Sequence, residues 1–199
     1  MRERIESSND YRRIANAAAL LLFGGLAGYI IAVEGGRPRP APGAPPSAPA
    51  AEPGAVVDES QLHAYRDILA RDPRNRQAAI GAGNLLYDAQ RYQEAIGFYQ
   101  QALAVEPSDI SVSTDLGTAL WYAGRADDAL AQYERSLALN PAHAQTLLNV
   151  GIVRADGKHD YAGAIAAWET LLKTNPDYPA VARVQSLLAD ARAKTPSTR

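Results

Sequence analysis

The chain contains no cysteine, and this absence removes several kinds of chemistry. Disulfide bonds, thiol catalysis and cysteine-ligated metal sites are excluded among its 199 residues. The strings H-E-x-x-H and G-x-S-x-G and the phosphate-binding loop are also missing. Its three histidines, His63, His143 and His159, are widely separated in sequence. We therefore expect neither enzymatic activity, nor a metal site, nor a cofactor.

The chain also lacks an excess of positive charge. Its formal net charge is −2, and residues 58–199 carry 14 basic and 17 acidic side chains, a net charge of −3. Nucleic-acid binding depends on a basic patch that neutralises phosphates. We therefore expect no nucleic-acid partner.

What the sequence does contain is a recurring segment. Three columns of equivalent residues mark its register: glycines (Gly83, Gly117, Gly151), alanines (Ala95, Ala129, Ala164) and aromatics (Tyr99, Tyr133, Trp168). The period is about 34 residues, a length that indicates stacked supersecondary units. Arrays of this kind present extended binding surfaces.

Each unit is predicted to hold two helices. The second helix ends before Pro107, Pro141 or Pro176, because proline disfavours helical geometry in the residue before it. A glycine inside the first helix costs roughly 1 kcal/mol relative to alanine. Close approach of two helices, with the aromatic side chain filling the remaining space, would offset this cost. The third copy has one extra residue, which we place in its DGKHDY turn.

The pattern of glycine, alanine, aromatic, alanine and proline resembles the tetratricopeptide repeat (TPR), a helix–turn–helix unit of about 34 residues. The resemblance covers roughly residues 58–194 and implies an all-α solenoid. We expect a half repeat, three full repeats and a C-terminal capping helix, followed by a short tail, residues 195–199. The half repeat is inferred from Tyr65 and Pro73, which lie one repeat length before Tyr99 and Pro107.

Residues 14–33 form an apolar run that predicts a single transmembrane helix. Its 20 residues span about 30 Å as a helix, which is the thickness of a bilayer core. A cleaved signal peptide is the main alternative, although its apolar core is usually shorter and Ala32-Val33-Glu34 is a poor cleavage site. Gly24 and Gly28 have the GxxxG spacing that lets two such helices pack together, so self-association through them is a further hypothesis.

The flanking charges predict the orientation of this span. Four arginines precede the span and two follow it closely, so residues 1–13 are expected in the cytoplasm. The repeats would then face the periplasm of a bacterium, anchored in its inner membrane. Residues 34–57 hold seven of the chain's 13 prolines, and this composition predicts an extended spacer between membrane and repeats.

In TPR arrays the first helices line a concave groove, and the resemblance implies the same for this chain. Helical periodicity selects the side chains that would point into the groove: Gln77, Ile80, Asn84, Tyr87, Asp88, Thr114, Thr118, Trp121, Tyr122, Leu148 and Ile152. Trp121 has an alternative position as a core residue between repeats. Tryptophan and tyrosine are enriched at binding hot spots, which favours the groove.

These features predict a membrane-tethered adaptor or scaffold whose groove binds a protein or peptide partner. In architecture the chain resembles tethered periplasmic TPR proteins that assist envelope assembly, such as cytochrome c maturation factors and translocon-associated chaperone subunits. The same sequence also fits a permanent accessory subunit of a large membrane complex. The partner's identity does not follow from either hypothesis.

Overall fold

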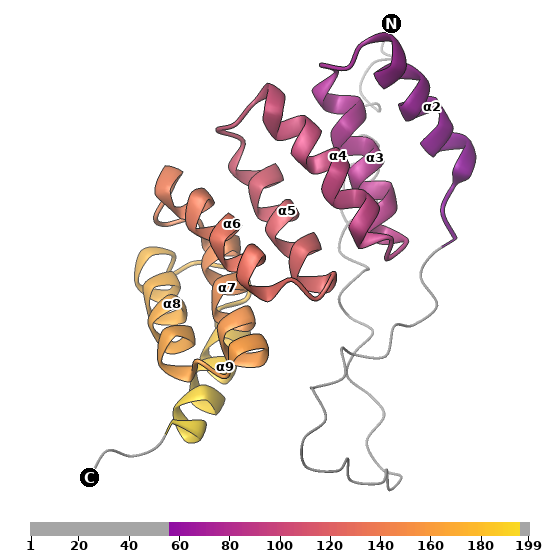
Figure 1. Ribbon diagram of the computed structural model, residues 1–199. Coiled ribbons are helices and arrows are strands. Elements are labelled where there is room, and N and C mark those ends of the chain that lie inside the picture. The colour runs from indigo at the N-terminus through magenta and orange to yellow at the C-terminus, as the bar shows by residue number, and fades with distance from the viewer. Residues whose placement is uncertain (1–55, 196–199) are drawn as a thin grey trace, which may run out of the picture. The chain divides into compact units, whose positions relative to one another are not determined.

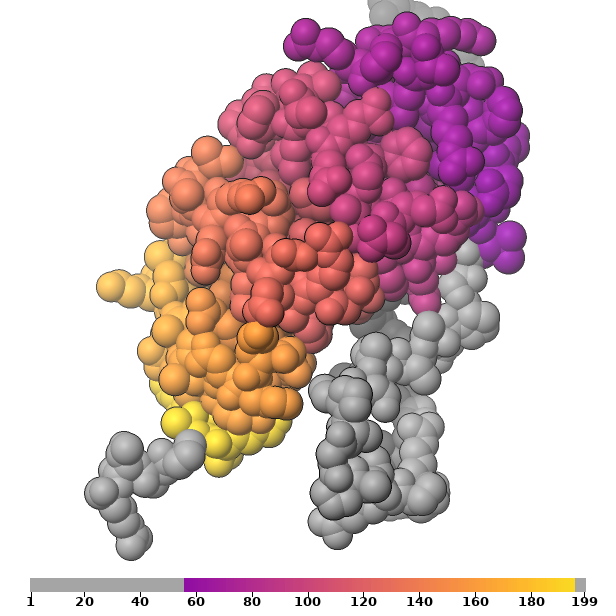
Figure 2. All heavy atoms as spheres, viewed as in Figure 1, coloured from indigo at the N-terminus to yellow at the C-terminus, as the bar shows by residue number. Residues whose placement is uncertain are grey.

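All regular structure in the computed structural model, which describes residues 56–195, is helical (Figure 1). The elements are α2 (Glu59–Arg71), α3 (Arg76–Asp88), α4 (Tyr92–Val105), α5 (Ile110–Tyr122), α6 (Ala126–Leu139), α7 (Ala144–Ile152), the π-helical turn η1 (Val153–Gly157), α8 (Tyr161–Thr174) and α9 (Val181–Lys194). Each helix packs against the next one in the chain, and successive segments adjoin one another from indigo to yellow (Figure 2). The prediction of an all-α solenoid is confirmed for this part of the chain.

The predicted transmembrane helix, residues 14–33, lies outside the described residues, as do residues 1–13 and almost all of the predicted linker. Between residues 56 and 195, no helix combines the length and the apolar character needed to cross a bilayer.

The helix ends follow from residues that the sequence places at the repeat boundaries. The residue before each repeat proline ends a helix with its backbone outside the helical region: Asp72, Glu106, Asn140 and Asn175 have φ near −135° and positive ψ. Asn75 follows Asp72 by three residues, and Asp109 follows Glu106 by three. Each is the N-cap of the next helix. Their side chains accept hydrogen bonds from the backbone N–H of the third residue ahead, at 3.0 and 3.1 Å.

The recurring glycines allow the two helices of a repeat to approach each other. A Cβ on Gly83 would come within 2.7 Å of the Tyr99 ring, closer than real Cβ contacts allow. At Gly117 and Gly151 a Cβ would meet the rings of Tyr133 and Trp168 closer still. These rings are almost fully buried, so the predicted pairing of glycine with an aromatic side chain is confirmed in all three repeats.

The extra residue of the third repeat is accommodated by the π-helical turn η1. In repeats one and two a turn hydrogen bond joins residues five apart, Arg91 N to Leu86 O and Arg125 N to Leu120 O. The equivalent bond in repeat three joins residues six apart, Asp160 N to Arg154 O at 2.8 Å. The positive φ of Gln90 and Gly124 recurs at His159. The turn itself is therefore unchanged, and the extra residue widens the end of the first helix instead.

The core consists of two apolar clusters. One is built mainly from α2 to α6, around Leu62, Leu86 and Tyr99, and the other from α7 to α9, around Trp168 and Val184.

Buried polar groups lie where α5, α6 and α7 meet. Gln132 Nε2 and Ser136 Oγ both donate to Ser113 Oγ at 2.7 Å. Thr114 and Thr146 share a hydrogen bond between their hydroxyls, also at 2.7 Å. Among the described residues, no buried side-chain nitrogen or oxygen lacks a hydrogen-bond partner.

Candidate binding face

We define the first-helix face as the solvent-accessible side of α3, α5 and α7 together with η1. Polar contacts connect these helices to one another. Arg76, at the start of α3, pairs with Asp109, which caps α5. Asn149 Nδ2 on α7 donates to Thr118 Oγ1 on α5 at 3.1 Å. Side chains from successive repeats therefore lie next to one another on this face.

Three tyrosine rings form a cluster at one end of the first-helix face. Tyr87 lies in the last turn of α3, Tyr92 begins α4 and Tyr122 ends α5. The ring centroids of Tyr92 and Tyr122 are 5.1 Å apart in a stacked arrangement. The Tyr87 ring meets Tyr92 at 5.3 Å and Tyr122 at 6.0 Å, edge-on in both cases. Tyr122 is 43% exposed, so an arriving ligand can reach the cluster.

The phenol of Tyr99 donates a hydrogen bond to Asn84 Oδ1 at 2.9 Å. Burial raises the pKa of Tyr99, and the charges of Asp115 and Asp88 raise it further. Both carboxylates therefore act on one phenol, although they belong to different helices. Asp88 follows Asn84 by one helical turn on α3, and Asp115 is on α5.

Asp115 is exposed by surface area, but the protein around it removes part of its hydration. This desolvation, together with the charge of Asp109, raises the pKa of Asp115 to about 6. Desolvation also raises the pKa of Asp88. Both groups carry their negative charge at an energetic cost, and a nearby cation would reduce that cost.

The first-helix face is negatively charged. The helices α3, α5 and α7 with η1 contain two cationic side chains, and both are paired: Arg76 with Asp109 and Arg154 with Asp160. Their three acidic side chains, Asp88, Asp115 and Asp156, form no ion pair with any described residue.

A small hollow of about 40 Å³ lies on this face between α5 and α7. Four predicted groove residues line it, together with three others: Thr118, Trp121, Tyr122 and Ile152, with Tyr133, Asn149 and Val153. Its volume suits a methyl or methylene group rather than a whole ligand. The hollow is therefore a shallow socket next to the tyrosine cluster.

The structure assigns the predicted groove residues to three environments. Gln77, Asn84, Asp88 and Tyr122 are exposed, and Ile80, Tyr87, Thr118, Trp121 and Ile152 are partly buried. Thr114 and Leu148 are buried, at 3% and 4% exposure, so they do not line the face. Thr114 bonds to Thr146 of the next repeat, and Leu148 packs in the second core cluster. Thr114 therefore faces α7, and Leu148 faces the apolar interior shared by α7, α8 and α9.

Trp121 has features of both positions considered from the sequence, the groove and the core between repeats. Its ring packs against the first core cluster and against Gly157, where an added Cβ would lie 2.5 Å from the ring. It also lines the small hollow. The rings that contact Tyr87 are those of Tyr92 and Tyr122. Trp121 instead fills the space beside the widened turn of repeat three.

Two residues of this face were missed or undervalued at the sequence level. Tyr92 was not selected because it belongs to a second helix, although its position directly after the turn brings it next to Tyr87. Asp115 was not selected either. The absence of any cation on α5 was the signal that could have identified it.

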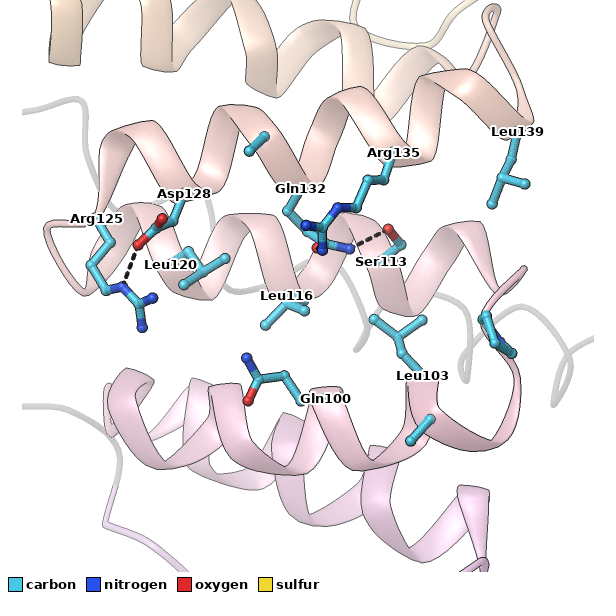
Figure 3. A pocket seen from close by; sticks show the side chains of 13 residues that line it. Gln100, Leu103, Ser113, Leu116, Leu120, Arg125, Asp128, Gln132, Arg135 and Leu139 are labelled. Carbon is cyan, nitrogen blue, oxygen red and sulfur yellow. Dashed lines mark hydrogen bonds and ion pairs between the residues drawn. The ribbon is translucent and has the colours of Figure 1, made fainter.

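A larger hollow of about 480 Å³ lies elsewhere, between α4, α5 and α6 (Figure 3). Leu103, Leu116 and Leu120 contribute apolar surface to it. Most of its polar side chains are bonded to one another, since Arg125 pairs with Asp128 at 2.7 Å and Arg135 donates to Gln132 Oε1 at 3.2 Å. This hollow therefore offers few unsatisfied groups to a ligand. Within residues 56–195, no group of three histidine or acidic side chains is arranged to hold a metal ion.

Comparison with known proteins identifies the repeats. Residues 62–110 and 114–158 match the family model of the tetratricopeptide repeat. No curated protein sequence matches the chain. The chain therefore carries tetratricopeptide repeats.

Solved structures show the same fold at low sequence identity. A crystal structure of MamA is 20% identical, with a TM-score of 0.56, and the match covers 67% of this chain and 85% of MamA. The type III secretion translocator chaperone SycD of Yersinia enterocolitica is 17% identical, with a TM-score of 0.57 and coverage of 60% and 92%. A tetratricopeptide repeat protein from Parabacteroides merdae is 20% identical, with a TM-score of 0.59 and coverage of 69% and 56%.

Proposed function

We propose that this tetratricopeptide-repeat chain is a membrane-tethered adaptor that holds a segment of a partner protein on its first-helix face. The observation that carries the proposal is the tyrosine cluster, whose Tyr122 ring is 43% exposed on a face where the acidic side chains form no ion pair with any described residue. Exposed aromatic rings and unpaired polar groups supply the anchors and the hydrogen bonds that peptide recognition requires. Domains with this fold commonly bind protein partners, which agrees with the proposal.

The tether is the part of the proposal that depends on the sequence alone. Residues 14–33 would span the bacterial inner membrane, and the proline-rich residues 34–57 would hold the repeats away from it in the periplasm. An anchored binding face gains effective concentration toward other proteins of the same membrane. Assembly or maturation of an envelope complex is a task that benefits from this arrangement.

Site-specific photo-crosslinking in native membranes tests the binding face. A photoreactive amino acid in place of Tyr122 is expected to form an adduct with one partner protein, whereas the same group in place of Leu139 on α6 is expected to give none. Both side chains are about half exposed, so the comparison controls for accessibility. Equal adducts at both positions, or none at Tyr122, would contradict the proposal. Adducts at a fixed stoichiometry with the partner would indicate a permanent subunit rather than an adaptor.

Membrane fractionation tests the tether. The chain is expected to stay in the membrane after alkaline carbonate washing, with its N-terminus intact, and to be degraded when protease is added to spheroplasts. A mature chain that begins after residue 33 would replace the anchor with a signal peptide. Protection from the protease would place the repeats in the cytoplasm.

A further inference from the structure

The tyrosine cluster presents an aromatic surface that can accept apolar parts of a ligand. The Tyr92 and Tyr122 rings are stacked with their centroids 5.1 Å apart, and Tyr122 is 43% exposed. Tyr122 also lines the hollow of about 40 Å³ between α5 and α7, together with Trp121 and Ile152. An accessible ring beside a hollow of methylene size suits a proline ring and the small aliphatic residues next to it.

The residues that lead into α2 lie at the same end of the array as this cluster. Glu59, the first residue of α2, pairs with Arg91, and their charged atoms are 2.6 Å apart. Arg91 directly precedes Tyr92. Val57 is partly buried against the first core cluster, and Tyr87 packs against the same cluster. The chain therefore enters α2 from a point close to the tyrosine cluster.

A proline-rich segment with the sequence PSAPAAEP, residues 46–53, precedes this point and lies outside the described residues. Its composition predicts the polyproline II conformation, which has three residues per turn and a rise of about 3.1 Å per residue. Pro46 and Pro49 are three residues apart, so in this conformation they occupy the same face of the segment.

The segment is long enough to reach the exposed ring. Pro49 precedes Val57 by eight residues, which corresponds to about 25 Å in this conformation. Along the array, α3 and α4 lie between α2 and α5 (Figure 1). The axes of packed helices are about 8–10 Å apart. Tyr122 at the end of α5 is therefore within reach of Pro49, and Pro46 would lie one turn farther on, toward α7.

Tethering gives this segment an advantage over a free peptide. A short flexible connection to a binding site supplies an effective concentration in the millimolar range. Polyproline II segments also lose little conformational entropy when they bind an aromatic surface, because their conformation is already formed. A weak contact is therefore sufficient to keep the cluster occupied.

The larger hollow between α4 and α6 is a weaker candidate despite its size. Its charged side chains pair with each other or with neighbouring amides, as Arg125 does with Asp128. Nothing in its lining selects one class of ligand over another.

We propose that residues 46–53 bind in cis to the tyrosine cluster, with Pro49 on the exposed Tyr122 ring and Pro46 at the small hollow beside Trp121. Bound in this way, the segment covers the first-helix face until a partner displaces it. This inference rests on the proposed function, because it describes how access to that same face is regulated.

A distance measurement between two spin labels tests the proposal in the full-length chain, purified in detergent micelles. The chain has no cysteine, so labels attach only where cysteine is introduced. Ala50→Cys places one label within the segment, and Gln93→Cys places the other at the exposed position after Tyr92. We expect a short and narrow distance distribution between the two labels.

Variants of the segment and of the cluster should each reduce the short-distance population at least threefold. One is the double variant Pro46→Ser and Pro49→Ser, and the other is Tyr122→Ala. Tyr122→Phe should preserve the population, because the ring remains. A broad distribution in the starting chain, or one that neither variant changes, would overturn the inference.

Matched controls remove equivalent groups elsewhere. Pro38→Ser with Pro42→Ser takes away two prolines outside the segment, and Leu139→Ala truncates a side chain on α6 that is also about half exposed. Neither should alter the distances. Dilution with unlabelled chains identifies the source of the segment. A short distance that disappears on dilution would mean that a second copy supplies it, and this would overturn binding in cis.

Photo-crosslinking at position 122 separates this inference from the proposed function. In the double variant Pro46→Ser and Pro49→Ser, the yield of the partner adduct should rise at least twofold, because no internal segment competes. A partner adduct whose yield stays the same would overturn the inference and leave the proposed function standing. Short distances that the variants abolish, without a partner adduct in either chain, would support binding in cis and overturn the proposed function.

Discussion

The acidic side chains of the first helices and those of the second helices differ in whether they form ion pairs. On the second helices, Glu94, Asp127, Asp128 and Glu169 each form an ion pair, and only Glu134 does not. On the first helices, Asp88, Asp115 and Asp156 all remain without an ion pair among the described residues. Charges that neutralise each other contribute solubility and little else, whereas charges left unpaired retain the capacity to attract a ligand. Among the described helices of the repeats, the acidic side chains without an ion pair are therefore concentrated on the first helices.

Glycine shows the same division. Gly117 on α5 lies against the Tyr133 ring, whereas Gly97 on α4 has no atom near its missing side chain. The first-helix glycines are required because any larger residue would collide with an aromatic ring. At Gly97, on an exposed surface, a larger residue would meet no atom. The four predictions that follow test this division, from the largest expected effect to the smallest.

Replacing Trp121 by alanine should lower the free energy of unfolding by about 2–4 kcal/mol, because the ring packs on the core and on Gly157. Tyr122→Ala, at the adjacent and more exposed position, should cost about 1 kcal/mol or less. Denaturant unfolding followed by far-ultraviolet circular dichroism measures both. Equal losses would mean that the two side chains do not differ in structural role.

Gly117→Ala should destabilise the chain by about 1–3 kcal/mol, because its methyl group would collide with a buried ring that has no free space to move into. Gly97→Ala should have the opposite sign and stabilise by about 0.5–1 kcal/mol, through helix propensity alone. Thermal unfolding of the two variants side by side gives the comparison. A stabilising Gly117→Ala would contradict the close-approach role of the first-helix glycines.

Asp115→Asn should stabilise the chain at pH 7 by about 1 kcal/mol, after allowance for solvent screening of an exposed group. The folded-state pKa of Asp115 is about 6, above its ordinary value of 3.8, so the wild-type chain loses stability as pH rises through this window. The advantage of the variant should therefore disappear as pH falls from 6 to 4. Unfolding free energies measured across this range test the sign, and a difference independent of pH would refute desolvation of the charged carboxylate as the cause.

Asp128→Asn should change stability by no more than about 0.5 kcal/mol, because its ion pair with Arg125 is exposed to solvent. Its effect should shrink further at high salt, since screening weakens exposed pairs. Denaturant unfolding in low and high salt measures both quantities. A loss above about 1 kcal/mol, the upper end for exposed pairs, would show that the second-helix ion pairs are structural elements rather than surface neutralisation.

Much of the fold was predictable because it depends on spacing. The columns of glycine and aromatic residues specify which side chains must meet, and the prolines specify where helices end; both predictions hold at Gly117 and Tyr133 and at Asn140 before Pro141. These features are local or repeat at a fixed interval, so one sequence displays them directly.

The binding face was predictable only in outline. Helical periodicity selected Tyr87 and Tyr122, but it also selected Thr114 and Leu148, which are buried. Thr114 bonds to Thr146 of the next repeat, and Leu148 packs in the second core cluster. Periodicity gives the direction of a side chain from its own helix, but it does not give the tilt of the following helix, which decides what is covered. The placement of Tyr92 beside Tyr87 likewise depends on how a turn folds back, and the sequence alone does not determine that geometry.

The widened turn at Val153–Gly157 also affects how such arrays tolerate changes in length. One residue inserted into a regular helix rotates everything beyond it by about 100°, enough to turn an interface away from its neighbour. In repeat three the additional residue bulges out, and the left-handed residue His159 and the bond from Asp160 restore the phase before α8 begins. Within the repeat the glycine still meets the aromatic ring, since Gly151 lies against Trp168 as Gly117 lies against Tyr133. A change of length at the end of a first helix can therefore leave the pairing of the two helices of that repeat intact.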